Sequence, residues 1–399
     1  MKIKKFSIQN YRSLKNLKID DFGETTIFYG DNNAGKSNIL NALHLIFMRK
    51  PKLASGGDLS ELENFYGGNI KDSQNIYFNN DTSSNIKFSV DIEVSRSELI
   101  IDDDIKSLFT DANLTFTFEG IIYFIGQGDH DYSEFKIESI KNGSVVIYSY
   151  ASDVAYFPSI DNEKSNQSSL AKAFTRLVDI FNDCVYVVSS SRDMHDTPMQ
   201  SDEVKLLAPE TFKQFLYSLY LSTTKHKLFE KIDSVYSQAP FNFGKISFSN
   251  DAGKLEIMIQ ETDFRLPIKY LGTGALQSLY IISSIICSRS KIVCLEELEQ
   301  NLSPRKQFQF LRKIQGMMVD PNLSLSQLII SSHSSVYSKP KLGMIYFLEK
   351  IDGKTTVLIK EKEKISTKMV GHLAHSQLTT DEADFEEIKR ILKEEQDFT

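Results

Sequence analysis

The chain has 399 residues, of which 41% are hydrophobic and 25% are charged, and its net charge is −7. This length allows one large domain or two to three smaller ones, and the composition is that of an ordinary globular protein. The acidic balance argues against a protein that coats nucleic acid with its whole surface, although it leaves room for a local basic groove.

The first half of the chain is predicted to consist mainly of strands. Residues 3–9 and 25–29 predict two strands, and apolar residues at helical spacing predict a helix over residues 38–47. Residues 50–80 are rich in Gly, Asn, Asp and Ser and predict an irregular surface segment. Alternating apolar stretches then predict a largely antiparallel sheet over residues 86–94, 114–120, 121–125 and 144–150.

The second half is predicted to begin with helices and to continue as alternating helices and strands. Residues 168–182 and 203–237 predict helices, 184–188 a buried strand, and KISFSN and KLEIMIQ a hairpin around residues 251–253. The elements expected after that are a helix over 274–288, a strand over 291–295, a helix over 304–318, strands over 327–331, 343–348 and 354–360, and a charged helix over 381–395. Such alternation favours a parallel sheet flanked by helices. The sequence shows neither an internal repeat nor a sustained heptad pattern.

The cysteines and the N-terminus predict a cytoplasmic protein without a membrane partner. Cys184, Cys287 and Cys294 lie in or beside apolar runs without CxxC spacing, so neither a zinc knuckle nor a disulfide framework is expected. Polar residues interrupt the opening MKIKKFSIQNYRSLKNL, which therefore lacks the apolar core of a signal peptide. No stretch reaches the ~20 apolar residues that span a bilayer.

The stretch FYGDNNAGKSNILNAL contains a phosphate-binding loop pattern. Gly30, Gly35, Lys36 and Ser37 match G-x-x-x-x-G-K-[ST] between a predicted strand and a predicted helix. Backbone N–H groups of such a loop surround a phosphate, Lys36 can reach the β- and γ-phosphates, and the Ser37 hydroxyl can ligate Mg²⁺. A chance glycine-rich turn is the alternative, which the four matched positions and their flanks disfavour. The expected nucleotide contacts are Asn32, Asn33, Ala34, Gly35, Lys36, Ser37 and Asn38.

The stretch KIVCLEELEQNLSP is an apolar strand that ends in the carboxylates Glu296 and Glu297. A hydrophobic strand that ends in acid beside a phosphate-binding strand is the Walker B arrangement. We expect Glu296 to hold the Mg²⁺ shell and Glu297 to orient or deprotonate the attacking water. The alternative is an ordinary strand that ends at an acidic surface loop.

Two further segments place polar groups near this arrangement. In KYLGTGALQSLYIISSI, Gly272, Thr273 and Gly274 precede an amphipathic helix whose N-terminus can bind an anion, and a second such site predicts contact with the nucleotide of another molecule. In QLIISSHSSVYS, a strand delivers His333 to its polar end, where the imidazole can hydrogen-bond a γ-phosphate. A plain loop-to-helix turn and a structural histidine are the respective alternatives.

These four motifs, in this order, resemble the ABC-type ATPase heads of the SMC-like and OLD-like group, over the first ~50 and the last ~130 residues. GDNNAGKSNILNAL and LEELEQNLSP are most similar to the OLD-like branch, in which Glu-Glu-Pro-Glu precedes a Leu-x-Pro turn. By this resemblance Arg12, after the aromatic residue of IQNYRSLKNLKID, lies near the phosphates. VVSSSRDMHDTP resembles a mid-chain Arg motif of this branch and adds Arg192.

The chain also departs from the family pattern. Leu298 replaces the customary Pro, and Gly272 stands where the ABC signature has Ser, which leaves the identity of the signature hydroxyl open. No clear Q-loop glutamine emerges, with Gln74 and Gln127 as candidates. Only about 50 residues follow the strand at 343–348, so the TOPRIM nuclease domain of OLD proteins does not fit, and the long coiled coil of SMC proteins has no room.

The resemblance implies an α/β fold, an ABC-type P-loop ATPase head with a parallel core sheet, an antiparallel β-subdomain and a helical insertion. We expect an N-terminal ATPase lobe at 1–160, a helical insertion at 161–240 and a C-terminal lobe at 241–399 with signature, Walker B and switch histidine. Expected ligands are ATP and Mg²⁺, and the expected partner is a second copy, or a higher homo-oligomer, that shares each ATP.

The resemblance leaves three roles open. The leading hypothesis is a sensor or scaffold in anti-phage defence, with a separately encoded effector such as a nuclease. A second is a RecF-like DNA-repair ATPase, for which DNA binding would weaken steeply with salt. A third is a nucleotide-gated scaffold with negligible turnover.

Overall fold

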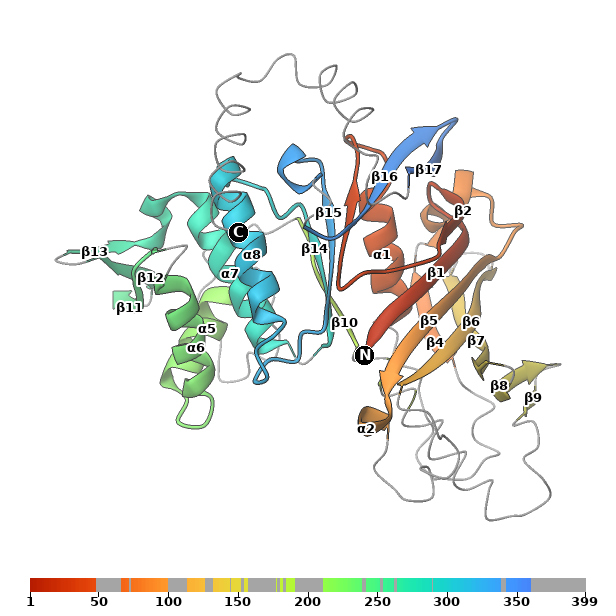
Figure 1. Ribbon diagram of the computed structural model, residues 1–399, viewed down its shortest axis with the longest axis horizontal. Coiled ribbons are helices and arrows are strands. Elements are labelled where there is room, and N and C mark those ends of the chain that lie inside the picture. Colours follow the sequence, from red (N-terminus) through yellow and green to blue (C-terminus); the bar gives the residue numbers. More distant parts are fainter. Residues whose placement is uncertain are drawn as a thin grey trace, which may run out of the picture.

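The computed structural model describes residues 1–47, 66–71, 73–99, 113–125, 132–143, 145–151, 154–156, 177, 180–181, 184–190, 211–238, 242–251, 254–261, 264–288, 290–338 and 342–359. Within these residues the strands form three sheets (Figure 1). The predicted α/β class, with a parallel sheet, an antiparallel β part and a helical segment, is confirmed.

A six-stranded sheet of order β10-β14-β15-β3-β16-β17 lies at the centre of the molecule. Its strands are β3 (Thr25–Tyr29), β10 (Val185–Val188), β14 (Ile292–Glu296), β15 (Gln327–Ser332), β16 (Met344–Ile351) and β17 (Lys354–Ile359). All neighbours are parallel except β16 and β17, which form an antiparallel hairpin. The early strand β3 therefore lies between two strands from far later in the sequence.

An eight-stranded antiparallel sheet lies on one side of this central sheet (Figure 1). Its order is β2-β1-β5-β6-β7-β8-β9, and β4 pairs with β7. Its strands are β1 (Lys2–Tyr11), β2 (Leu14–Ile19), β4 (Tyr66–Lys71), β5 (Ile86–Ser95), β6 (Asn113–Ile125), β7 (Tyr132–Asn142), β8 (Val145–Ala151) and β9 (Val154–Tyr156). The short helical turns beside them are η2 (Ser73–Ile76), η3 (Phe78–Asn80) and α2 (Arg96–Leu99).

A small antiparallel sheet and most of the helices lie on the opposite side (Figure 1). The sheet consists of β11 (Lys245–Asp251), β12 (Lys254–Glu261) and β13 (Phe264–Pro267). The helices are α1 (Lys36–Phe47) on the side of the eight-stranded sheet, and α5 (Phe212–Leu221), α6 (His226–Ser237), α7 (Thr273–Cys287) and α8 (Pro304–Met317) on the other, with turns η5 (Ile268–Leu271) and η6 (Ser335–Tyr337). No helix of the described residues is long and apolar enough to cross a membrane.

The central sheet is buried on both faces because its side chains alternate between two hydrophobic cores. In β14, Ile292 and Cys294 join the core formed with α1 and the antiparallel sheet, whereas Val293 and Leu295 join the core formed with α5 to α8. All five residues of β14 are buried, as are those of β3. Strands that are covered on both faces carry continuous apolar runs. The central strands could therefore be predicted from such runs in the sequence.

Several expected elements differ from the structure. Residues 114–120 and 121–125 form one strand, β6, with a register shift at Glu119 and Gly120. A side chain at Gly120 would collide with the ring of Phe88, so this glycine marks a bulge in a continuous strand and not a turn between two strands.

Other predictions were wrong in their boundaries. The expected irregular segment at 50–80 contains β4, η2 and η3 among its described residues, because pairing with β7 outweighs the weak strand propensity of Tyr-Gly-Gly-Asn. The helical structure expected over 203–237 is present in its described residues as α5 and α6, which are separated where the Ser222 hydroxyl accepts a hydrogen bond from the Lys225 N–H. Strands β7 and β13 were not predicted. The helix expected at 381–395 and residues 203–210 lie outside the described residues.

The three cysteines are all free, as expected. Cys184 and Cys294 are buried, and burial raises the pKa of the Cys287 thiol to about 12. Thiols held in the protonated form are poor nucleophiles, so these side chains act as small apolar groups.

One buried side chain joins the central sheet to the antiparallel sheet. Gln327, at the start of β15, has no exposed surface and accepts a hydrogen bond from Ile3 N–H at 2.8 Å. Its Nε2 donates to the carbonyls of Ile3 at 2.9 Å and Gly23 at 3.0 Å. This one amide therefore satisfies three backbone groups of the N-terminal segment, which would otherwise be buried without partners.

We expect Gln327→Leu to lower the free energy of unfolding by about 2–4 kcal/mol, because the backbone groups at residues 3 and 23 lose their partners while remaining buried. Urea denaturation followed by circular dichroism measures the change. Gln309→Leu, at a half-buried position on α8, is the control and should shift stability by less than about 0.5 kcal/mol. Equal effects of the two substitutions would contradict the assignment.

Candidate functional site

The parallel register brings three strand ends to one edge of the central sheet. Leu295 and Glu296 of β14 pair with Ile330 and Ser331 of β15, and Ser332 of β15 pairs with Tyr29 of β3. Loops that follow parallel strands at their carboxyl ends form the ligand site of open α/β sheets. The next residues, Glu297, His333 and Gly30, therefore begin three adjacent loops.

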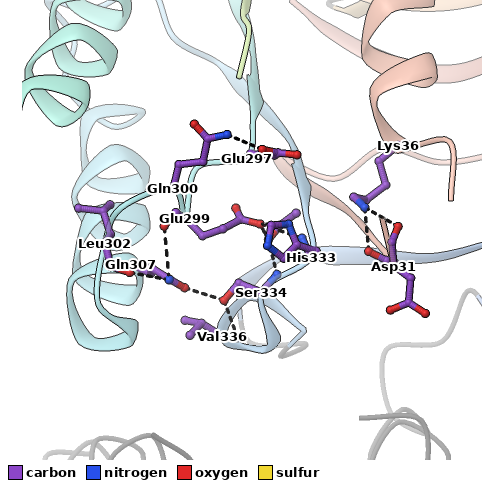
Figure 2. Close-up of polar contacts among 12 residues, drawn as sticks. Asp31, Lys36, Glu297, Glu299, Gln300, Leu302, Gln307, His333, Ser334 and Val336 are labelled. Carbon is purple, nitrogen blue, oxygen red and sulfur yellow. Dashed lines mark hydrogen bonds and ion pairs between the residues drawn. The ribbon is translucent and has the colours of Figure 1, made fainter. Parts of the chain in front are cut away.

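The phosphate-binding loop lies between β3 and α1, as the sequence predicts. The buried ammonium of Lys36 donates to the carbonyl oxygens of Gly30 and Asp31, both at 2.8 Å (Figure 2). Desolvation lowers the pKa of Lys36, and the carboxylates of Glu299, Glu297, Asp31 and Glu296 oppose that shift in this order. The lysine is thus held in the loop by two neutral carbonyls and surrounded by acidic groups at longer range.

The β16–β17 hairpin packs against this loop. Gly35 has a φ of 96°, and a side chain there would collide with the Thr355 hydroxyl of β17. A side chain at Gly30 would collide with the Leu348 carbonyl of β16. Lys350 Nζ also lies 3.3 Å from Asn33 Oδ1. Both glycines of the loop pattern are therefore required for contact with the hairpin, and Gly35 is required for the turn as well.

Arg12, which the family resemblance predicts to lie near the phosphates, contacts a residue at the start of α1. Its Nη1 is 3.5 Å from Asn38 Oδ1, and Asn38 Nδ2 donates to the Ser13 hydroxyl at 2.7 Å. The Ser13 hydroxyl in turn lies 2.7 Å from that of Thr355. These contacts connect Arg12 to the phosphate-binding loop and to the hairpin through one polar network. Asn32 and Asn33 are exposed, Ala34 is buried and Ser37 is half-buried.

Glu296 is buried at the end of β14, and its Oε2 accepts from the N–H of Ser190 at 3.0 Å and from the Ser190 hydroxyl at 3.2 Å. The adjacent strand carries Ser331 at the same register, and its buried hydroxyl has no hydrogen-bond partner among the described residues. Carboxylate and hydroxyl oxygens are suitable ligands for Mg²⁺. The residues present therefore fit the cation that the loop pattern implies. Ser190 was not predicted.

Glu297 begins the loop after β14 in a left-handed backbone conformation, with φ of 47°. Its N–H donates to the Ser331 carbonyl at 2.9 Å, and its Oε2 accepts from Gln300 Nε2 (Figure 2). A non-glycine residue with positive φ is uncommon and often occurs at functional sites. The side chain remains half-buried, with access to the edge of the sheet.

His333 contacts Glu299, a carboxylate to which the sequence analysis gave no role. His333 Nδ1 lies 3.2 Å from Glu299 Oε1, and the same oxygen accepts from the His333 N–H at 2.8 Å and the Ser332 hydroxyl at 2.7 Å (Figure 2). The signal was present in the sequence, since Glu299 is the last glutamate of LEELE and occupies the fourth position of Glu-Glu-Pro-Glu.

Gln307 of α8 holds the loop after β15 from the other side. Its Oε1 accepts from the Ser334 hydroxyl at 2.6 Å, and its Nε2 donates to the Leu302 carbonyl at 2.8 Å (Figure 2). The Tyr337 hydroxyl donates to the Gln307 carbonyl at 3.1 Å. The loops that carry Glu299 and His333 are therefore fixed to one another through α8.

The predicted signature segment lies apart from the phosphate-binding loop. Gly272 and Thr273 are exposed, and Gly272 has a φ of 90°, with no atom near the position that a Cβ would occupy. Gly274 is buried against the Asn301 carbonyl, so the start of α7 packs on the loop that follows Glu297. None of the contacts within the described residues joins this segment to Lys36.

The remaining candidate residues from the sequence are the two glutamines considered for the Q-loop and the arginine of the mid-chain motif. Gln74 lies in η2, whereas Gln127 and Arg192 lie outside the described residues. Across the described part of the chain, no group of three or more His, Cys, Asp and Glu residues is arranged to hold a metal ion.

A phosphate-binding loop next to an acidic strand end on a parallel sheet defines a P-loop nucleoside triphosphatase. The chain belongs to the AAA ATPase domain family, whose pattern matches residues 1–336. It is similar to an ATP/GTP phosphatase of Helicobacter pylori, with 23% identity over 330 residues that cover 75% of this chain and 76% of that protein.

Solved structures similar to this chain include SMC head domains. An SMC head bound to the C-winged helix domain of ScpA has 12% identity and a TM-score of 0.49, and the match covers 91% of this chain and 99% of the other. The SMC head domain from Thermotoga maritima has 13% identity and a TM-score of 0.43, with 90% and 100% covered.

We expect Lys36→Ala to weaken the binding of a fluorescent ATP analogue by about ten- to a hundredfold, which corresponds to the loss of a charge-assisted hydrogen bond of about 1.5–3 kcal/mol. Fluorescence anisotropy titration measures the affinity. The control Lys227→Ala, at an exposed position of α6, removes the same charge away from the loop and should bind as the wild type does. Unchanged affinity in Lys36→Ala would exclude the loop as the triphosphate site.

Proposed function

We propose that the protein hydrolyses ATP with Mg²⁺ at the edge of the central sheet and that each site is completed by a second copy of the chain. The observation that carries the proposal is the adjacency of the three loops that begin at Gly30, Glu297 and His333. Figure 2 draws Lys36, Glu297 and His333 around this edge. The match to the ATPase family and the similarity to an ATP/GTP phosphatase support the same reaction.

Each residue has a distinct part in this proposal. The loop N–H groups and Lys36 bind the β- and γ-phosphates, and Arg12 adds a second positive charge near the start of α1. Glu297 orients the attacking water and accepts its proton. His333 donates a hydrogen bond to the terminal phosphate. Burial lowers the pKa of Lys36 by desolvation, and the acidic groups around it oppose that shift.

Ser37 and Glu296 would hold the magnesium ion, which when bound neutralises charge on the phosphate oxygens. The Ser190 hydroxyl and N–H, just after the end of β10, orient the Glu296 carboxylate. The Ser331 hydroxyl, buried and without a partner among the described residues, lies at the register position next to Glu296 and is a further oxygen for the hydration shell of the ion.

The need for a second copy follows from the exposed start of α7. The helix N-terminus at the exposed Gly272 and Thr273 offers N–H groups that can bind an anion. Because this helix start lies apart from Lys36, we infer that it binds the triphosphate held by another copy of the chain. Binding of two shared nucleotides would draw the copies together, and hydrolysis would release them. Such a cycle is suited to a sensor or scaffold in the cytoplasm that acts with a separate effector. The OLD-like resemblance supports a nuclease of a defence system as that effector.

We expect Glu297→Gln to bind ATP as tightly as the wild type and to lower turnover by about a hundredfold or more, since the amide cannot accept the proton of water. Phosphate release with Mg²⁺ and ATP measures turnover, and the fluorescent analogue measures binding. The matched control Glu138→Gln, at an exposed position of β7, should leave both unchanged. Near-normal turnover in Glu297→Gln would remove Glu297 from the mechanism.

Mixing two inactive variants tests whether the sites are shared between copies. Thr273→Glu places a negative charge at the exposed start of α7, where it suits the helix but repels a triphosphate. An equal mixture of Lys36→Ala and Thr273→Glu should recover about a quarter of the wild-type turnover, because half of the dimers contain one intact site of two.

Thr273→Ser is the control for the mixing experiment and should remain active by itself, since it keeps a neutral hydroxyl at the start of α7. An inactive mixture would show that each chain builds its site alone, and normal turnover of Thr273→Glu by itself would show that the start of α7 has no part in the site.

A further inference from the structure

Glu299 is a nearly buried carboxylate whose contacts all lie on one of its oxygens. Oε1 accepts from the Ser332 hydroxyl and the His333 N–H and lies 3.2 Å from His333 Nδ1. Oε2 is buried and has no hydrogen-bond partner among the described residues. The side chain is only 5% exposed, whereas that of His333 is 46% exposed.

A buried carboxylate with one unsatisfied oxygen lowers stability unless another interaction compensates. Within the described residues, His333 is the one ionisable side chain at ion-pair distance from Glu299. Lys36 lies farther away and responds to the charge of Glu299 more than to that of any other carboxylate. The negative charge of Glu299 therefore acts on two groups, the imidazole of His333 and the ammonium of Lys36 in the phosphate-binding loop.

We propose that Glu299 is a positioning residue that holds His333 with its proton on Nδ1, so that the other ring nitrogen, Nε2, is presented toward the terminal phosphate. A hydrogen bond at one ring nitrogen decides the protonation of the other. This inference adds a residue role to the proposed ATPase function, and the kinetic test described below rests on that proposed function. No bond is formed or broken by Glu299, which acts only through the orientation and tautomer of the imidazole.

The loop geometry separates this role from a purely structural one. Gln307 and Ser334 hold the backbone after His333 without Glu299, and the Ser334 hydroxyl also accepts from the Val336 N–H at 3.4 Å. In Glu299→Gln the amide oxygen can still accept from Ser332 and from the His333 N–H. The substitution therefore removes the charge that faces Nδ1 while most of the local hydrogen bonds remain.

The carboxylates of Glu297 and Glu299, in the loop after β14, have different surroundings and are suited to different roles. Glu297 is half-buried, pairs with the Gln300 amide and keeps access to the sheet edge. Glu299 is buried behind His333 and has no such access. Two acids in one site that differ in environment typically serve different functions. Glu297 is thus suited to contact water and Glu299 to contact the histidine.

The tautomer of His333 tests the proposal without any nucleotide. Histidine labelled with ¹⁵N, in the full-length protein at pH 8, gives long-range ¹H–¹⁵N correlations, and comparison with His333→Asn assigns the signals of His333. We expect the Nδ1–H tautomer in the wild type and a shift toward the Nε2–H tautomer in Glu299→Gln. An Nε2–H tautomer in the wild type would overturn the proposal, even if Glu299→Gln failed to fold.

Kinetics test the same idea through a double-mutant cycle. Glu299→Gln should lower kcat by about tenfold or more with little change in KM, and the pair Glu299→Gln/His333→Asn should be no slower than His333→Asn alone. If the decrease in kcat of the double variant equalled the product of the decreases in the two single variants, Glu299 would act independently of His333.

The exposed pair His226 and Glu230 on α6 is the matched control, since Glu230→Gln removes a carboxylate 3.9 Å from an imidazole at the surface and should leave kcat unchanged. If the wild type showed no turnover, the proposed ATPase function would fail, while the tautomer result would still decide the role of Glu299.

Discussion

The parallel pairing of β3 with β15, and of β15 with β14, is the constraint on which the site depends. These strands are buried on both faces, and alternate side chains enter two different cores, so a shift of one residue in register would exchange the contents of both. With the register fixed by that cost, the residues that follow the strands have fixed places. Gly30, Glu297 and His333 begin adjacent loops because the apolar residues before them could pack in only one way.

At this edge of the sheet, the loss of hydration of buried charged groups is opposed by their attraction to neighbouring groups of opposite charge. Lys36 loses solvation, which lowers its pKa, and four carboxylates partly restore the charged form. Glu296 and Glu299 are buried at the same edge and receive N–H and hydroxyl hydrogen bonds in place of water. The Ser331 hydroxyl beside Glu296 has no partner among the described residues, so these oxygens fit the magnesium ion that the loop pattern implies.

Contacts from distant parts of the chain complete the phosphate-binding loop. The hairpin β16–β17 contacts both glycines of the loop pattern, and Thr355 connects through Ser13 and Asn38 to Arg12. Gln327 joins the same N-terminal segment to the start of β15. Movement of the hairpin or of the antiparallel sheet would therefore reach the loop through direct packing, which gives a physical route by which a bound partner could alter the nucleotide site.

Local patterns were enough to predict the strands buried on both faces, the loop Gly30–Ser37 and the acidic end of β14, because continuous apolar runs and glycine spacing depend on local chemistry. They placed β6 in two pieces and missed β4, β7 and β13, whose formation depends on pairing with distant strands. The contact of His333 with Glu299, and the support that Thr355 and Ser190 give to the site, became visible only in the folded chain. Those contacts join residues that are far apart in sequence, and no local pattern specifies which side chains meet when three strands from different parts of the chain align.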